Sequence, residues 1–81
     1  MKLQVKLFAA AQQAVGQPMV EIELGRAATV ADLRQQLVAN FPALETLQSH
    51  LLVAVDQQYA PDDLSLKQGD EVACFPPVSG G

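Results

Sequence analysis

The sequence predicts an α+β domain in which one main helix packs across a mixed sheet of about five strands. Two observations support this prediction. Short segments that alternate apolar and polar residues occur near both ends of the chain, as strands with one buried face require. Between them lies a longer segment whose apolar residues are three and four positions apart, the spacing of a helix with one buried face. The 81 residues allow one small domain.

The first two strands are predicted near the N-terminus. Residues 2–8 alternate leucine and valine with lysine and glutamine, which is typical of a half-buried strand. Residues 9–15 predict a short helical turn that Gly16-Gln17-Pro18 would end. Residues 20–24 alternate valine, isoleucine and leucine with glutamate. They predict a second strand, paired with the first as a hairpin.

The main helix is predicted to begin at Thr29. Thr29 as N-cap, with Asp32 three residues later, is a variant of the capping box, in which both side chains accept hydrogen bonds from free amides. The helix should end at Phe41-Pro42, because proline disfavours helical geometry in the residue before it. Residues 43–49 add a further helical turn. The stripe that should face the sheet is formed by Val30, Leu33, Leu37 and Phe41.

Three more strands are predicted in the second half of the chain. Residues 51–55 form an uninterrupted apolar run, consistent with an internal strand, and residues 56–58 would turn it back into a short segment around Tyr59. Residues 71–75 are the last strand, and they could lie beside the first. The order strand, strand, helix, strand, short strand, strand is that of the β-grasp, or ubiquitin-like, architecture.

The last six residues cannot belong to a packed core. Two consecutive prolines lack amide donors, so strand pairing should stop near Phe75. We therefore expect a β-grasp domain over residues 1–75 and a flexible, extended tail over residues 76–81. The tail residues are Pro76, Pro77, Val78, Ser79, Gly80 and Gly81.

The tail presents one reactive group, the carboxylate of Gly81. Near neutral pH this carboxylate is ionised, because its reference pKa is about 3.5, and it could attack an activated phosphate. The absence of side chains on Gly80 and Gly81 lets the backbone enter a narrow channel. Six extended residues reach at most about 20 Å. A tail of this kind suits insertion of the carboxylate into the active site of another protein.

Three aromatic residues are candidates for a partner surface. By strand parity, Phe8 and Phe75 point away from the core, and Tyr59 lies in a turn-rich segment with few core partners. If the first and last strands are neighbours, Phe8 and Phe75 form one exposed apolar patch at the root of the tail, of the kind that often marks an interface. The alternative is that the strand ends twist and both rings cap the core.

Composition and charge exclude several classes of function. The net charge is −4, and the five basic residues are scattered, which disfavours nucleic-acid binding. The longest apolar runs, Leu7 to Ala11 and Leu51 to Val55, are far shorter than the roughly 20 residues of a membrane span. The lone cysteine excludes an internal disulfide, and we expect a cytoplasmic protein.

The sequence shows no catalytic site of its own. It contains no phosphate-binding glycine loop, no metal motif and no triad, and a single cysteine with a single histidine argues against zinc. Cys74 shares the inward parity of the last strand, so a buried, small apolar role is expected for it. We therefore expect no metal and no bound cofactor.

The C-terminal segment resembles a known family. Gly69-Asp70-Glu71-Val72 leads into a short apolar strand, and Phe75-Pro76-Pro77-Val78-Ser79-Gly80-Gly81 follows. This run closely resembles the sulfur-carrier small subunits of molybdopterin synthase. Residues 3–16 and 51–57 are also similar to the family, so the resemblance covers the whole chain. Cys74 departs from the family, in which an aromatic residue is usual, and Gln12 replaces a basic residue that some members have.

The resemblance implies a function for the tail. An ATP-using adenylyltransferase of the ubiquitin-activating type would adenylate Gly81, and sulfur would then replace the adenylate to leave a thiocarboxylate. The tail would deliver this sulfur to cyclic pyranopterin monophosphate inside the synthase large subunit, forming the dithiolene of molybdopterin. Phe8, Tyr59 and Phe75 match family positions that contact partners. The assembly would be a heterotetramer of two small and two large subunits.

Three other functions remain open at this point, and one of them is a plain adaptor domain whose tail has no role. A sulfur carrier of the thiamine type has the same fold and the same Gly-Gly end, although those chains tend to be shorter and the Phe-Pro-Pro-Val segment fits them poorly. A ubiquitin-like modifier would instead join Gly81 to lysines of other proteins. In the last two cases the chain carries the reactive carboxylate and an enzyme partner supplies the catalysis.

Overall fold

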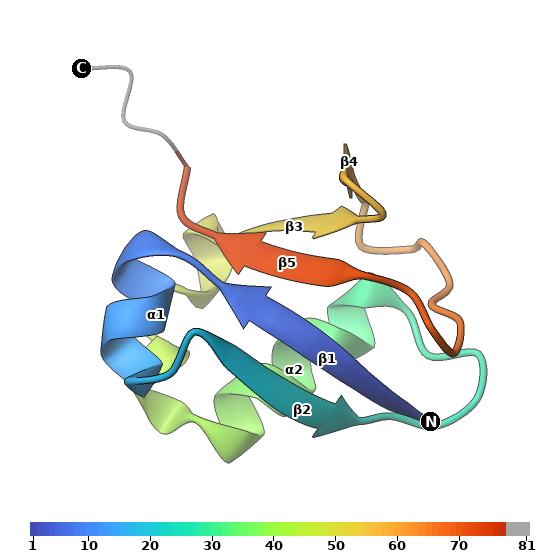
Figure 1. Cartoon of the computed structure of the whole chain (residues 1–81), viewed down its shortest axis with the longest axis horizontal. Helices are drawn as coiled ribbons and strands as arrows, with labels where there is room; N and C mark the ends of the chain where they lie inside the picture. Colours follow the sequence, from blue (N-terminus) through green and yellow to red (C-terminus); the bar gives the residue numbers. More distant parts are fainter. Residues whose placement is uncertain (78–81) are drawn as a thin grey trace.

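Five strands form one sheet in the order β2-β1-β5-β3-β4, and the computed structural model describes residues 1–77 of the chain (Figure 1). β1 and β5 are parallel, and the other neighbouring pairs are antiparallel. The sheet is therefore mixed, as predicted, and the last strand of the chain lies at its centre beside the first. The strands are β1 (Lys2–Leu7), β2 (Met19–Glu23), β3 (Leu52–Val55), β4 (Gln58–Tyr59) and β5 (Val72–Phe75).

Within residues 1–77, two α-helices accompany the sheet. α1 (Ala9–Val15) connects β1 to β2, and α2 (Val30–Asn40) lies behind the sheet in Figure 1. Residues 43–49, predicted as a helical turn, lie within two short 3-10 helices and the turn between them, Pro42–Leu44 and Gln48–His50. None of the helices in the described residues is long and apolar enough to cross a membrane.

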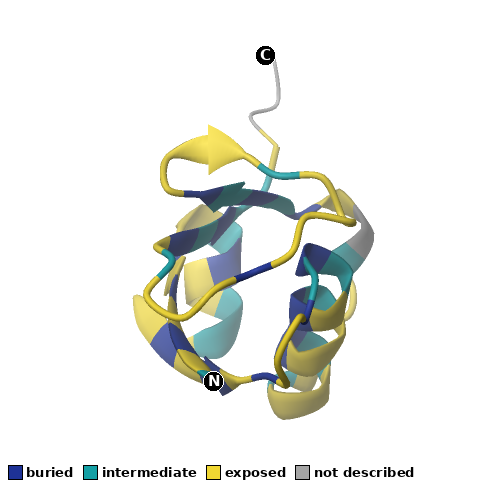
Figure 2. Ribbon diagram, turned by 90° about the vertical axis from the view of Figure 1, so that its right-hand side faces the viewer, coloured by how far each residue is buried: buried dark blue, intermediate teal, exposed yellow. Residues whose placement is uncertain are grey.

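The core lies between α2 and one face of the sheet. Side chains alternate along β1, so that Leu3, Val5 and Leu7 are buried while the residues between them are exposed. The same alternation occurs in β2, β3 and β5 (Figure 2). Because burial follows a period of two, residues 1–77 leave the opposite face of the sheet uncovered. The residues of α2 that complete the core are Val30, Leu33 and Leu37.

The predicted capping box of α2 is present. The Thr29 backbone N–H donates to Asp32 Oδ2 at 2.9 Å, and the Asp32 N–H donates to Thr29 Oγ1 at 3.3 Å. Two of the amides that a helix start leaves without partners are thus satisfied. The helix ends at Asn40, before Phe41-Pro42. Phe41, which the predicted stripe included, is the C-cap and is half-buried.

Some strand boundaries differ from the prediction. The first strand was expected over residues 2–8, but it ends at Leu7 because Phe8 is the N-cap of α1. The Phe8 carbonyl accepts hydrogen bonds from the backbone N–H groups of Ala11 and Gln12. The strands expected at 20–24, 51–55 and 71–75 are observed at 19–23, 52–55 and 72–75. These shifts do not change the order or the pairing of the strands.

Candidate functional site

The chain leaves the sheet from its central strand. Phe75 is the last residue of β5, and it is paired with Leu52 on β3. On the other side of β5, the backbone N–H of Phe8 donates to the carbonyl of Cys74 at 3.1 Å. Strand pairing thus stops at Phe75, as the two prolines predicted. Pro76 is half-buried and Pro77 is exposed, and the four remaining tail residues, Val78 to Gly81, lie outside the described residues.

The predicted partner-binding residues are all at least partly exposed. Phe8 is 47% exposed and Tyr59 is 72% exposed, while Phe75 is half-buried. The Tyr59 and Phe75 rings contact each other, with centroids 5.8 Å apart and planes at 51°. We predicted a patch that joins Phe75 to Phe8, and the aromatic contact that the structure shows joins Phe75 to Tyr59. The alternative that Phe8 caps the core is wrong.

Register places more apolar residues around this aromatic pair than the sequence indicated. On the uncovered face of the sheet, Tyr59 is opposite Ala54, Ala54 is opposite Ala73, and Phe75 is opposite Leu52. Met19 on β2, which is 42% exposed, belongs to the same face. We call this region the apolar half of the outer face, and it surrounds the point where the tail begins. It consists of Met19, Leu52, Ala54, Tyr59, Ala73 and Phe75, and the exposed Phe8 follows β1 beside it.

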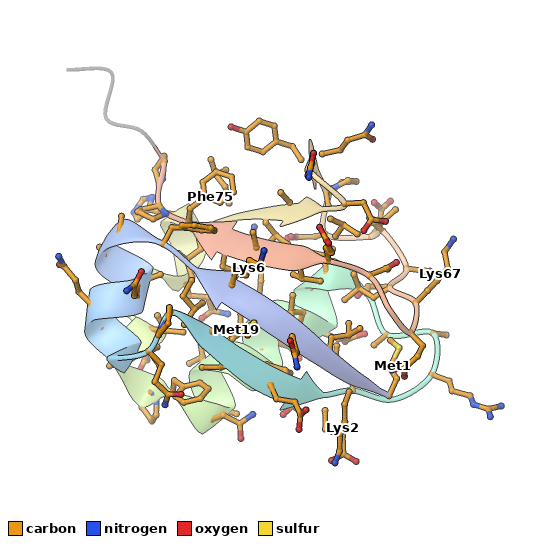
Figure 3. The ribbon with its side chains drawn as sticks, viewed as in Figure 1. Met1, Lys2, Lys6, Met19, Lys67 and Phe75 are labelled. Atoms are coloured by element: carbon orange, nitrogen blue, oxygen red, sulfur yellow. The ribbon has the colours of Figure 1, made fainter. Side chains whose placement is uncertain are left out.

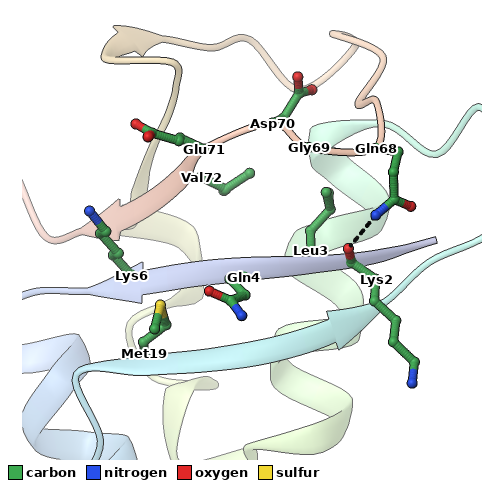
Figure 4. A pocket seen from close by; sticks show the side chains of 10 residues that line it. All are labelled: Lys2, Leu3, Gln4, Lys6, Met19, Gln68, Gly69, Asp70, Glu71 and Val72. Carbon is green, nitrogen blue, oxygen red and sulfur yellow. Dashed lines mark hydrogen bonds between the residues drawn. The ribbon is translucent and has the colours of Figure 1, made fainter.

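The other half of the outer face is polar. Lys2 is opposite Glu23, and Gln4 is opposite Glu21, at the end of β1 that is remote from the tail. A groove of about 290 Å³ runs between β1 and residues 68–72, and it extends from Lys2 in this half to Lys6 and Met19 (Figure 4). The Gln68 side-chain amide donates to the Lys2 carbonyl across it at 3.3 Å. The described residues that line the groove include no serine, cysteine or histidine. The groove therefore lacks the side chains that most often act as nucleophile and base in covalent catalysis.

The remaining polar candidates have structural roles or are exposed. Asp62 forms an ion pair with Arg34, with 2.9 Å between Oδ1 and Nε, which ties the loop after β4 to α2. Asp70 accepts a hydrogen bond from the Lys67 N–H within its own turn. His50 is exposed at the end of a 3-10 helix. Residues 1–77 hold no group of three or more side chains that could bind a metal ion.

Cys74 is buried in the core, as its parity predicted. Burial raises the pKa of its thiol from 9.0 to about 12, and the charge of Arg34 opposes this shift. Thiolates, not thiols, are the reactive form of cysteine, so Cys74 is inert near neutral pH. Its role is to fill space in the core on the inner face of β5, the strand that carries the tail.

The Cys74 thiol should make the protein less stable in alkali. The folded state holds the proton more tightly than the unfolded state, so this stabilisation is complete below pH 9 and is lost as the pH rises toward 12. Urea unfolding of the wild type should show an extra loss on the order of 2 kcal/mol between pH 8 and pH 11, relative to Cys74→Val. Equal losses in both proteins would show that the thiol is not shielded from solvent.

Known proteins that are similar to this chain indicate its family. The model of the ThiS family matches residues 5–81. The molybdopterin synthase sulfur carrier subunit of Chlamydomonas reinhardtii is 39% identical over 83 residues, which cover all of both chains. The crystal structure of SAMP1 from Haloferax volcanii superimposes with a TM-score of 0.88 at 32% identity, again over all of both chains.

A more distant structure has the same fold. In the complex of subunits 1 and 2 of molybdopterin-converting factor from Helicobacter pylori, the matching chain is 21% identical and gives a TM-score of 0.71 over both whole chains. The ubiquitin-like fold predicted from the order of strands is thus the fold of solved relatives. The family model matches the chain through the tail, and a relative is similar over its whole length. This chain therefore belongs to the ThiS family of sulfur carriers.

Proposed function

We propose that this chain is the sulfur carrier subunit of molybdopterin synthase and that the carboxylate of Gly81 is its reactive group. The observation that carries the proposal is the path of the chain. The central strand ends at Phe75 and is followed by Pro76-Pro77 and four more residues that terminate in Gly80-Gly81. The matched relative from Chlamydomonas reinhardtii is named for this role. The folded domain then serves to present the carboxylate to enzymes that act on it.

The chemistry needs an activated carboxyl group, because a carboxylate is a poor electrophile. An adenylyltransferase of the ubiquitin-activating type would join the Gly81 carboxylate to the AMP portion of ATP and release pyrophosphate. AMP is a good leaving group, so the outer sulfur of a persulfide on a partner enzyme can displace it and form an acyl disulfide with Gly81. A second thiol of that enzyme then attacks the inner sulfur, which releases a thiocarboxylate on Gly81 and leaves a disulfide on the enzyme. Cyclic pyranopterin monophosphate would then receive this sulfur. ATP is used by the partner enzyme, and this chain itself binds no cofactor in the proposal.

The large subunit of the synthase is the second proposed partner. Support comes from the Helicobacter pylori complex, in which a chain of this fold is bound by a second subunit. We propose that two small and two large subunits assemble in the cytoplasm and that Phe8, Tyr59 and Phe75 contact the partner. Their exposure and their position at the root of the tail support this assignment. The tail residues Pro76 to Gly80 would enter the partner, with Gly80 providing clearance.

Sulfur loading can be measured directly by intact mass. After incubation with the activating enzyme, ATP and a sulfur source, the full chain should gain roughly 16 Da, the difference between sulfur and oxygen. A chain that lacks Gly81 should not gain this mass, because its new terminal residue, Gly80, stops one residue short of the activating site. Equal sulfur loading of the shortened chain would overturn the assignment of Gly81.

A protein modifier is the second candidate, since the chain is also similar to SAMP1, a small archaeal modifier protein. Both functions would activate the same carboxylate, but a modifier would end in isopeptide bonds to lysines of other proteins. An antibody against an N-terminal tag separates the two. Conjugates of higher mass on a blot favour the modifier, and a thiocarboxylate without conjugates favours the sulfur carrier.

A further inference from the structure

One row of side chains crosses all five strands on the outer face. The register places Met19 opposite Lys6, Lys6 opposite Ala73, Ala73 opposite Ala54, and Ala54 opposite Tyr59. Four of these five side chains belong to the apolar half. Lys6 is the exception, and it is flanked on both neighbouring strands by apolar residues. Figure 3 labels Phe75, Lys6 and Met19 on β5, β1 and β2, on the face that carries the root of the tail.

Lys6 forms no ion pair within the part of the chain that the structure describes. Among residues 1–77 the ion pair within 4.0 Å is that of Arg34 with Asp62. Glu21 is opposite Gln4 rather than Lys6, one pair further from the tail along the same face. Glu71, just before β5, lies diagonally across from Lys6 and lines the same groove, but it forms no ion pair with Lys6. The ammonium of Lys6 is therefore hydrated, while its aliphatic stem lies among apolar neighbours.

We infer that the partner that takes up the tail covers the apolar half and places a carboxylate against Lys6. This inference rests on the proposed function and adds the chemistry of the partner surface to it. An interface that buries Phe75 and Tyr59 at the root of the tail would also remove water from Lys6, which lies between them and Met19. A buried ammonium without a countercharge is strongly unfavourable, and since Lys6 has no ion pair within residues 1–77, a complementary partner would provide one.

Whether replacing Lys6 strengthens or weakens binding depends on this carboxylate. Methionine is unbranched and apolar, with a length close to that of lysine, so Lys6→Met extends the apolar half without changing its shape. If the partner is purely apolar at this point, Lys6→Met tightens binding. If the partner places a carboxylate there, Lys6→Met leaves that carboxylate buried without a countercharge and weakens binding by roughly tenfold or more.

The experiment compares Lys6→Met with Lys2→Met by calorimetric titration against the synthase large subunit of the same organism. Lys2 is exposed on the same face of the same strand, four residues away in the polar half, so it controls for the loss of one positive charge. We expect a rise of roughly tenfold or more in Kd for Lys6→Met and less than about threefold for Lys2→Met.

Every other outcome would contradict either the proposed carboxylate or the proposed function. Unchanged or tighter binding of Lys6→Met would overturn the carboxylate while leaving the proposed function in place. Equal weakening by both variants would show a general effect of charge and would overturn it as well. If the wild-type chain does not bind the large subunit, the proposed function is wrong and this inference fails with it.

Discussion

Replacing Phe75 with arginine should abolish binding of the chain to the synthase large subunit while the domain stays folded. Phe75 contacts Tyr59, lies opposite Leu52 on β3 and is the last residue before the two prolines. An aromatic side chain at the centre of an interface commonly contributes 2 kcal/mol or more, so we expect binding to weaken by roughly 30-fold or beyond the range of detection. The ring is half-buried, so a guanidinium can reach solvent at this position.

The stability of this variant distinguishes a surface role from a core role. Loss of the ring contact with Tyr59 should lower the unfolding free energy by about 1 kcal/mol, or Tm by roughly 5 °C. Val38→Arg is the matched control, because Val38 is also a half-buried apolar residue but lies on α2, behind the sheet. That variant should keep full binding. Unfolding of Phe75→Arg would instead show that Phe75 belongs to the core.

Local patterns predicted most of the fold. The capping box of Thr29 and Asp32 depends on residues three positions apart, so the sequence alone located the start of α2. Alternation in β1 identified Leu3, Val5 and Leu7 as core residues for the same reason. The strand end at Phe75 follows from the absence of an amide donor in Pro76. Each of these features is determined within a few residues of the chain.

Features that depend on register were harder to predict. The contact of Phe75 with Tyr59 exists because the two-residue turn at Asp56 and Gln57 brings β4 back beside β3. Both turn residues have positive φ, 51° and 71°, a conformation that usually calls for glycine or asparagine. The sequence indicated a turn here but not which residues it would place opposite each other. The position of Lys6 within the apolar half depends in the same way on pairing with both β2 and β5.

The tail could be assigned a chemical role only from its sequence. Val78, Ser79, Gly80 and Gly81 lie outside the described residues, so the structure supplies the root of the tail and not its end. The central claim is that the terminal carboxyl group of Gly81 does the chemistry. If a further residue followed Gly81, this carboxyl group would become a peptide carbonyl, which cannot be adenylated as a free carboxylate can.

The most direct test is therefore a chain extended by a few residues that no protease removes. Its matched control carries the same extension behind a protease site, which is cleaved beforehand to expose Gly81. Each is mixed with the large subunit, the activating enzyme, ATP, a sulfur source and cyclic pyranopterin monophosphate, and the molybdopterin formed is measured. We expect no detectable product from the uncleavable chain and wild-type yield from the cleaved one. Product formed by the uncleavable chain would contradict the claim that Gly81 carries the sulfur.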